Sequence, residues 1–136
     1  NAELNGFAPD VCKWQQADVF DYLRRAREAG DTYDLIILDP PKFASSHYHV
    51  DRAARAYKDI NLNGLRLLRA GGQLLTFSCS GAIDTDLFQK IVAGAVIDSR
   101  RQAWALSRFG AGVDHPLLMT FPEGEYLKGL HLKLCD

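Results

Sequence analysis

The sequence predicts an α/β fold in which parallel strands alternate with helices. Two apolar runs, 34–39 and 73–78, are bounded by turn or polar residues and do not alternate with polar positions. Unbroken runs of this length are typical of strands buried on both faces of a sheet. Because a helical pattern lies between them and a right-handed crossover joins parallel strands, their C-terminal ends should emerge at one edge of the sheet.

Three stretches carry apolar residues at helical spacing. Asp18 and Asp84 are suited to cap the first and the third of these helices, and the glycine pair 71–72 is suited to end the second. Near the C-terminus apolar and polar residues alternate, which is typical of a half-buried antiparallel strand. The predicted helices are 19–29, 51–70 and 85–97, and the further predicted strands are 126–134, a weaker one at 102–108 and another at 11–15.

Length and composition predict one domain over residues 1–136. Hydrophobic residues make up 47% of the chain and charged residues 24%, as in ordinary globular domains. The sequence has no apolar run of the roughly 18 residues that a membrane span needs and no signal-peptide pattern, which favours a cytoplasmic location. The chain opens at Asn1 and its one methionine is Met119, so we expect a piece of a longer protein.

The cysteines and histidines predict neither a disulfide framework nor a metal site. Cys12, Cys79 and Cys135 are far apart and lack C-x-x-C spacing, so we interpret them as reduced thiols. His47 and His49 lie in a polar loop without a third ligand, and such histidines are more often solvated than metal-bound.

The charge balance argues against a domain that binds nucleic acid over its whole surface. Sixteen Lys and Arg residues stand against 17 Asp and Glu residues, which gives a net charge of −1. Any RNA contact must therefore come from a local patch or from another domain. Arg52, Arg55 and Lys58, which follow the first predicted strand, are the candidates for phosphate contacts.

A carboxylate and a thiol follow the two predicted parallel strands. In open α/β sheets, ligands bind outside the carboxyl ends of the strands, which here are followed by Asp39 and Cys79. The pair Pro40-Pro41 stiffens the backbone after Asp39, and the helix predicted shortly after Cys79 favours a thiolate through its dipole. We expect Asp39 and Cys79 to face each other across one cleft.

Motifs along nearly the whole chain resemble a known family. The segments are 37–43, 57–61, 75–81, 122–124 and 126–129. They resemble ribosomal large subunit methyltransferase I, a bacterial family that uses S-adenosylmethionine to methylate carbon 5 of a cytosine in large-subunit ribosomal RNA. The resemblance implies a Rossmann-like class I methyltransferase fold, truncated at its N-terminal side so that strands 1 and 2 are missing, with an antiparallel C-terminal strand.

The resemblance also implies roles for individual residues. Cys79 would add as a thiolate to carbon 6 of the cytosine, and Asp39 would bond the polar edge of the flipped base. Lys42 would contact a neighbouring phosphate and Phe43 would stack on the base or wall it, with Arg55 and Lys58 as further substrate contacts. Many related enzymes carry a second cysteine where this chain has Pro40-Pro41, so no base is assigned to remove the carbon-5 proton.

The cofactor implied by the resemblance is S-adenosylmethionine. Asp18 matches the position that accepts the adenine amino group in this fold, Val19 would pack on the ring, and Asp39 and Pro40 complete the predicted cofactor contacts. The glycine-rich loop and the acidic residue that open the family pattern have no counterpart here, and neither does the N-terminal RNA-binding module. We therefore expect the chain alone to bind the cofactor weakly or not at all.

Simpler interpretations stand beside these roles. Asp18 can serve as a helix cap alone, Asp39 can belong to a plain strand-ending turn, and Cys79 can be a small buried hydrophobe. Two other functions remain open: methylation at a nitrogen, because Asp-Pro-Pro motifs occur in such enzymes as well, and a non-catalytic fragment that forms a homodimer through an exposed sheet edge.

Overall fold

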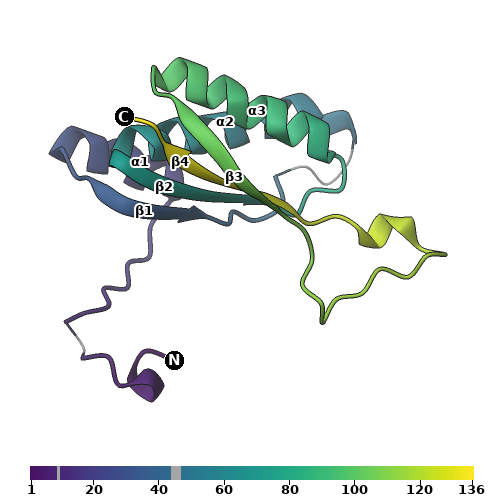
Figure 1. The fold of residues 1–136 in the computed structure, drawn as a ribbon, viewed down its shortest axis with the longest axis horizontal. Coiled ribbons are helices and arrows are strands. Elements are labelled where there is room, and N and C mark those ends of the chain that lie inside the picture. The colour runs from purple at the N-terminus through teal and green to yellow at the C-terminus, as the bar shows by residue number, and fades with distance from the viewer. Residues whose placement is uncertain (9, 44–46) are drawn as a thin grey trace.

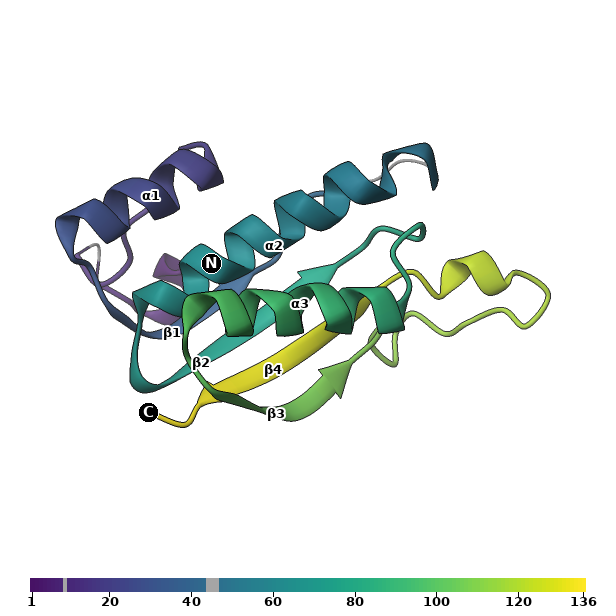
Figure 2. The same ribbon diagram turned by 90° about the horizontal axis from the view of Figure 1, so that it is seen from above.

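The chain folds into two layers, a sheet and a set of helices that covers one face of it (Figures 1 and 2). The computed structural model describes residues 1–8, 10–43 and 47–136. Within these residues the sheet has the strand order β1-β2-β4-β3, with β1 and β2 parallel and β4 antiparallel to both of its neighbours. The helices are α1 (Val19–Ala29), α2 (Val50–Leu67) and α3 (Thr85–Ser99), and the strands are β1 (Tyr33–Leu38), β2 (Leu68–Ser78), β3 (Ala103–Phe109) and β4 (Lys128–Leu134), with short 3-10 turns at Glu3–Asn5, His47–His49 and Pro122–Gly124.

The predicted caps define the beginnings of α1 and α3. Oδ1 of Asp18 accepts hydrogen bonds from the backbone N–H groups of Phe20 and Asp21, at 2.9 and 3.1 Å. Oδ1 of Asp84 accepts one from the N–H of Leu87 at 2.7 Å. Each bond satisfies an N–H that has no partner within the helix, so both predicted start points are confirmed.

The second helix ends earlier than predicted, and its predicted stop signal has another use. The helix α2 ends at Leu67, and Leu68 already has the extended conformation in which β2 begins. Gly71, with φ of +70°, lies in a bulge where the pairing of β1 with β2 shifts from Tyr33↔Leu68 to Leu35↔Gln73. The glycine pair 71–72 therefore shapes a bulge inside a strand, because glycine adopts positive φ without steric cost.

The strand predictions near the C-terminus are confirmed apart from their exact bounds, whereas the one near the N-terminus is wrong. The strands β3 and β4 pair antiparallel, and β4 begins at Lys128, two residues later than predicted. Residues 11–15 form no strand, and Val11 and Trp14 lie exposed. The segment projects from the domain in Figure 1 and lies beside no described strand with which it could pair.

The helices α1, α2 and α3 all lie on one face of the sheet, as Figure 1 shows. On that face Leu38, Leu74 and Leu132 are buried with the apolar sides of the helices. On the opposite face Leu35 is 50% exposed and Ile37 59% exposed. The prediction that the strands are buried on both faces is therefore wrong for β1, because no described helix covers the second face.

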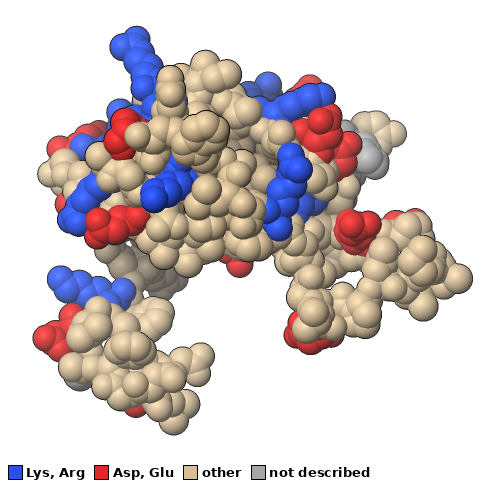
Figure 3. All heavy atoms as spheres, viewed as in Figure 1, with Lys and Arg blue, Asp and Glu red and all other residues tan. Residues whose placement is uncertain are grey.

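The surface carries mixed charge. On the face seen in Figure 3, Lys and Arg side chains are interspersed with Asp and Glu side chains. Among the described residues, none of the helices is long and apolar enough to cross a membrane.

Gly129 allows an aromatic ring to lie across β4. A Cβ at this position would lie 2.5 Å from Cδ1 of Phe77 and 3.2 Å from the carbonyl oxygen of Thr76. The Phe77 ring stacks on Phe109 with the ring centroids 5.7 Å apart, so it has little room to move away. We expect Gly129→Ala to lower the free energy of unfolding by about 1–3 kcal/mol, measured by urea denaturation.

The matched control is Gly110→Ala, because no atom lies within 4 Å of a Cβ built at Gly110. Equal stabilities for the two variants would contradict this account of the packing.

Candidate active site

The ends of β1 and β2 bring the predicted carboxylate and the predicted thiol to one edge of the sheet. Asp39 directly follows the last residue of β1, and Cys79 directly follows the last residue of β2. Leu38 is paired with Thr76, so the register continued by one residue places Asp39 beside Phe77, two residues before Cys79. With ordinary strand spacing this corresponds to about 8 Å between the two backbones. Asp39 is exposed and Cys79 is half-buried.

Tyr57 of α2 joins the two loops that follow these strands. Its side chain is fully buried, and its ring centroid lies 4.8 Å from that of Phe43 in the loop after β1. Its hydroxyl lies 3.0 Å from Oγ of Ser80 in the turn after β2. Both loops are thus held against the same side chain, which fixes their relative positions.

The backbone on both sides of Cys79 is well fixed. Ser78 and Ser80 are fully buried, and the N–H of Ser80 donates to Oγ of Ser78 at 3.3 Å. Cys79 lies between them and is itself half-buried. Such a position suits a nucleophile that must be accessible and held in place.

One cavity brings predicted cofactor contacts together. It has a volume of about 280 Å³ and lies where α1 begins beside the end of β1. Asp18 caps α1 immediately before this cavity and lies exposed at the surface. Asp18 does not line the cavity, but apolar walls beside the Asp39 carboxylate suit a flat, nitrogen-rich ring that bears an amino group, so the lining residues fit the adenine end of S-adenosylmethionine. The cavity is lined by Val19, Ile37, Leu38, Asp39, Pro40, Pro41 and Ile60.

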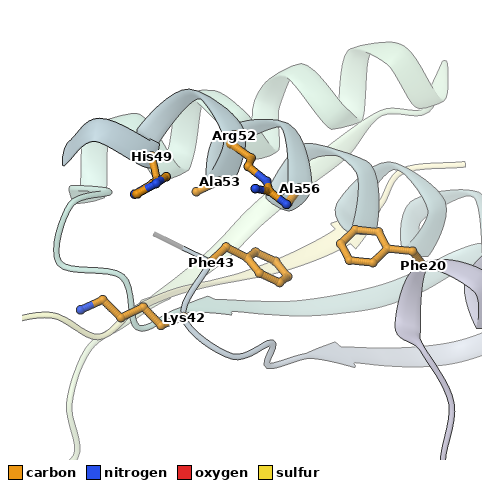
Figure 4. A pocket seen from close by; sticks show the side chains of 7 residues that line it. All are labelled: Phe20, Lys42, Phe43, His49, Arg52, Ala53 and Ala56. Atoms are coloured by element: carbon orange, nitrogen blue, oxygen red, sulfur yellow. The ribbon is translucent and has the colours of Figure 1, made fainter. Parts of the chain in front are cut away.

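A second cavity lies between the end of the same loop and α2 (Figure 4). Its volume is about 430 Å³. Lys42 and Phe43, both predicted to contact the substrate, line it, and Arg52 adds a second cation. Aromatic rings together with cations suit a nucleotide, which has a flat base and a charged phosphate. The lining consists of Phe20, Lys42, Phe43, His49, Arg52, Ala53 and Ala56.

Two predicted substrate contacts do not line this cavity. Nζ of Lys58 lies 2.8 Å from Oδ2 of Asp98 at the end of α3, so Lys58 ties α2 to α3. Arg55 lies exposed on α2 and does not line the cavity either. Conversely, spacing along the chain gave no signal for Phe20 and His49, because their positions depend on how α1 and α2 pack against the loop.

Among the residues that the structure describes, no group of three or more His, Cys, Asp and Glu side chains is arranged to hold a metal ion.

Curated relatives carry the family name that the motifs predicted. Proteins named "Ribosomal RNA large subunit methyltransferase I" match 96% of this chain at 51% identity in Shewanella amazonensis and at 49% in Shewanella frigidimarina. One from Erwinia tasmaniensis matches 95% of it at 49% identity. These relatives confirm the resemblance, and the chain spans 33% of the length of each. No protein-family model matches the chain.

Solved structures show the same fold. A crystal structure described as "SMU.776, a putative methyltransferase complexed with SAH" superposes on 97% of this chain with a TM-score of 0.80 at 24% identity, and the match covers 34% of that structure. A structure described as "a putative sam-dependent methyltransferase from Streptococcus mutans" gives a TM-score of 0.80 at 23% identity over 97% of this chain and 33% of its own. The predicted fold class is therefore confirmed as part of a Rossmann-like methyltransferase fold.

The contribution of Asp18 as a helix cap can be measured by substitution. Asp18→Ala removes the cap of α1 and should lower the free energy of unfolding by about 1 kcal/mol, whereas Asp18→Asn keeps a capping oxygen and should change it by less than about 0.3 kcal/mol. Urea denaturation measures both, with Asp10→Ala, an exposed position outside any helix, as the control. If Asp18→Ala were as stable as the Asp10→Ala control, the cap would not contribute to stability.

Proposed function

We propose that this chain is part of the catalytic domain of an S-adenosylmethionine-dependent methyltransferase that modifies carbon 5 of a cytosine in large-subunit ribosomal RNA. The observation that carries the proposal is the placement of Asp39 and Cys79 at adjoining strand ends, in loops joined through Tyr57. The names of the relatives support ribosomal RNA as the substrate. The fold and the cavity beside Val19 support the cofactor.

The role of Cys79 is to make carbon 5 of the cytosine, which is a poor nucleophile, reactive. Carbon 5 of cytosine reacts weakly with electrophiles until the Cys79 thiolate bonds to carbon 6 and turns the ring into an enamine. S-adenosylmethionine, when bound, supplies a methyl group on a positively charged sulfur. After carbon 5 has taken the methyl group, a base removes the proton from carbon 5. The double bond between carbon 5 and carbon 6 then re-forms, the bond between carbon 6 and the Cys79 sulfur breaks, and the cysteine returns to its thiolate form.

The residues around the cysteine bind and orient the base. Asp39 hydrogen-bonds the polar edge of the cytosine and, when it shares a proton with the ring, limits the charge that develops there. Phe43 forms a wall of the nucleotide cavity, and Lys42 and Arg52 hold a phosphate. Asp39 lines the cavity beside Val19, and Lys42 and Phe43 of the same loop line the nucleotide cavity, so one loop carries contacts to both the cofactor and the base.

Loss of the thiol tests the covalent mechanism. In the complete enzyme, Cys79→Ala should reduce methyl transfer by more than about 1000-fold, because carbon 6 then has no nucleophile. The matched control is Cys135→Ala, which removes an exposed thiol outside the site and should keep activity. Transfer of radioactive methyl groups to RNA measures both rates.

RNA that contains 5-fluorocytosine separates the carbon mechanism from methylation at a nitrogen. Fluorine at carbon 5 cannot leave as a cation, so the adduct with Cys79 should persist and migrate as a protein–RNA band under denaturing conditions. Two results together would instead indicate a nitrogen acceptor, which needs no adduct: the enzyme with Cys79 forms no such band, and the Cys79→Ala variant stays active.

Binding of the cofactor should need more than this chain. The cavity beside Val19 is small and open, and it offers contacts for the adenine end alone. We expect calorimetry to detect no binding of S-adenosylmethionine to the 136-residue chain at micromolar concentrations. Micromolar affinity of the chain alone would show that its own residues complete the cofactor site.

A further inference from the structure

A lysine is buried beside the turn that follows Cys79. Lys128 is the first residue of β4 and is paired with Ser78, the last residue of β2. It is 6% exposed, although lysine is almost never fully buried unless it is paired. A cation in such a place requires polar partners that replace the lost water.

The partners of Lys128 are two carbonyl groups of this turn. Its Nζ donates to the carbonyl oxygen of Ser80 at 2.7 Å and to that of Ile83 at 2.5 Å. The N–H of Ile83 also donates to the carbonyl oxygen of Ser80, at 3.1 Å, which closes the turn. The ammonium group thus connects both ends of the segment that links Cys79 to α3.

The charge of Lys128 lies on a group that is hydrogen-bonded to the residue directly after Cys79. Burial lowers the pKa of Lys128 below its ordinary value, while negative charge on Cys79 and on Asp84 acts to raise it. Asp84 is already engaged in capping α3. Arg108, another cation that lines the cavity of about 530 Å³ at this edge, bonds to Oε1 of Gln89 at 2.7 Å. Lys128 is therefore the cation of this edge that contacts the turn next to Cys79.

We propose that Lys128 is a positioning residue for Cys79: it fixes the turn after the cysteine through two carbonyl groups and stabilises the negatively charged sulfur. The inference rests on the proposed function, in which Cys79 reacts as a thiolate. A hydrogen-bonding role alone would require donors at this position, whereas stabilisation of the thiolate requires a positive charge.

Alkylation of the thiol tests this inference without RNA or cofactor. The 136-residue chain carries Cys12→Ser and Cys135→Ser, so that iodoacetamide reacts with Cys79 alone. Lys128→Gln keeps amide donors without the charge, and Lys128→Arg keeps the charge. The matched control is Lys133→Gln, an exposed lysine on the same strand.

At pH 7 we expect Lys128→Gln to be alkylated about fivefold more slowly than the Lys133→Gln control, and Lys128→Arg to react nearly as fast as the control. At pH 10 the difference should disappear, because an ordinary thiol is then ionised with either residue at position 128. Melting temperatures show that the variants are folded under these conditions.

Equal rates for Lys128→Gln and Lys133→Gln at pH 7 would overturn the inference, and so would a Lys128→Arg variant as slow as Lys128→Gln. If Lys128→Gln does not fold, the rate of Lys128→Arg is compared with that of Lys133→Gln, and this comparison decides. The result is separate from that of the activity assays: an active Cys79→Ala enzyme would refute the proposed mechanism, whereas the alkylation rates report on the surroundings of the sulfur.

Discussion

The ring and the hydroxyl of Tyr57 hold together the two loops on which the candidate site is built. The ring packs between Phe43 and Phe88, with an edge-on contact of 5.7 Å to the latter, and the hydroxyl meets Ser80. Because α2 crosses over from β1 to β2, one residue on its buried side can contact the loops after both strands. The crossover that makes the two strands parallel thus also places Tyr57 where it contacts the loops after both strands.

The one-sided cover of the sheet shows how much of the packing this chain supplies by itself. The helices bury Leu38, Leu74 and Leu132, whereas Leu35 and Ile37 point from the opposite face and stay half exposed. A sheet normally buries its apolar face against another layer. The chain spans about a third of the length of its curated relatives, and within its described residues no helix covers this face (Figure 1).

The sequence predicted those features that local chemistry determines. Aspartate caps, apolar spacing and strand alternation defined α1, α3 and β4 closely, and the motifs placed Asp39 and Cys79 at strand ends. The predictions from sequence were wrong where packing between distant segments decides the structure. The glycine pair 71–72 was predicted to end a helix but forms a bulge in β2, and β1 was predicted to be buried on both faces but is exposed on one. Helical spacing also gave no signal that Asp98 lies opposite Lys58 and pairs with it.

The geometry of the candidate site depends most directly on the coupling between Tyr57 and Ser80. A double-mutant cycle of Tyr57→Phe, Ser80→Ala and the combined variant, followed by urea denaturation, measures that coupling without reference to activity. We predict a coupling free energy of about 1 kcal/mol, since either substitution alone removes the same hydrogen bond. Effects of the two substitutions that add to within about 0.3 kcal/mol would show that the loops are not joined through this contact.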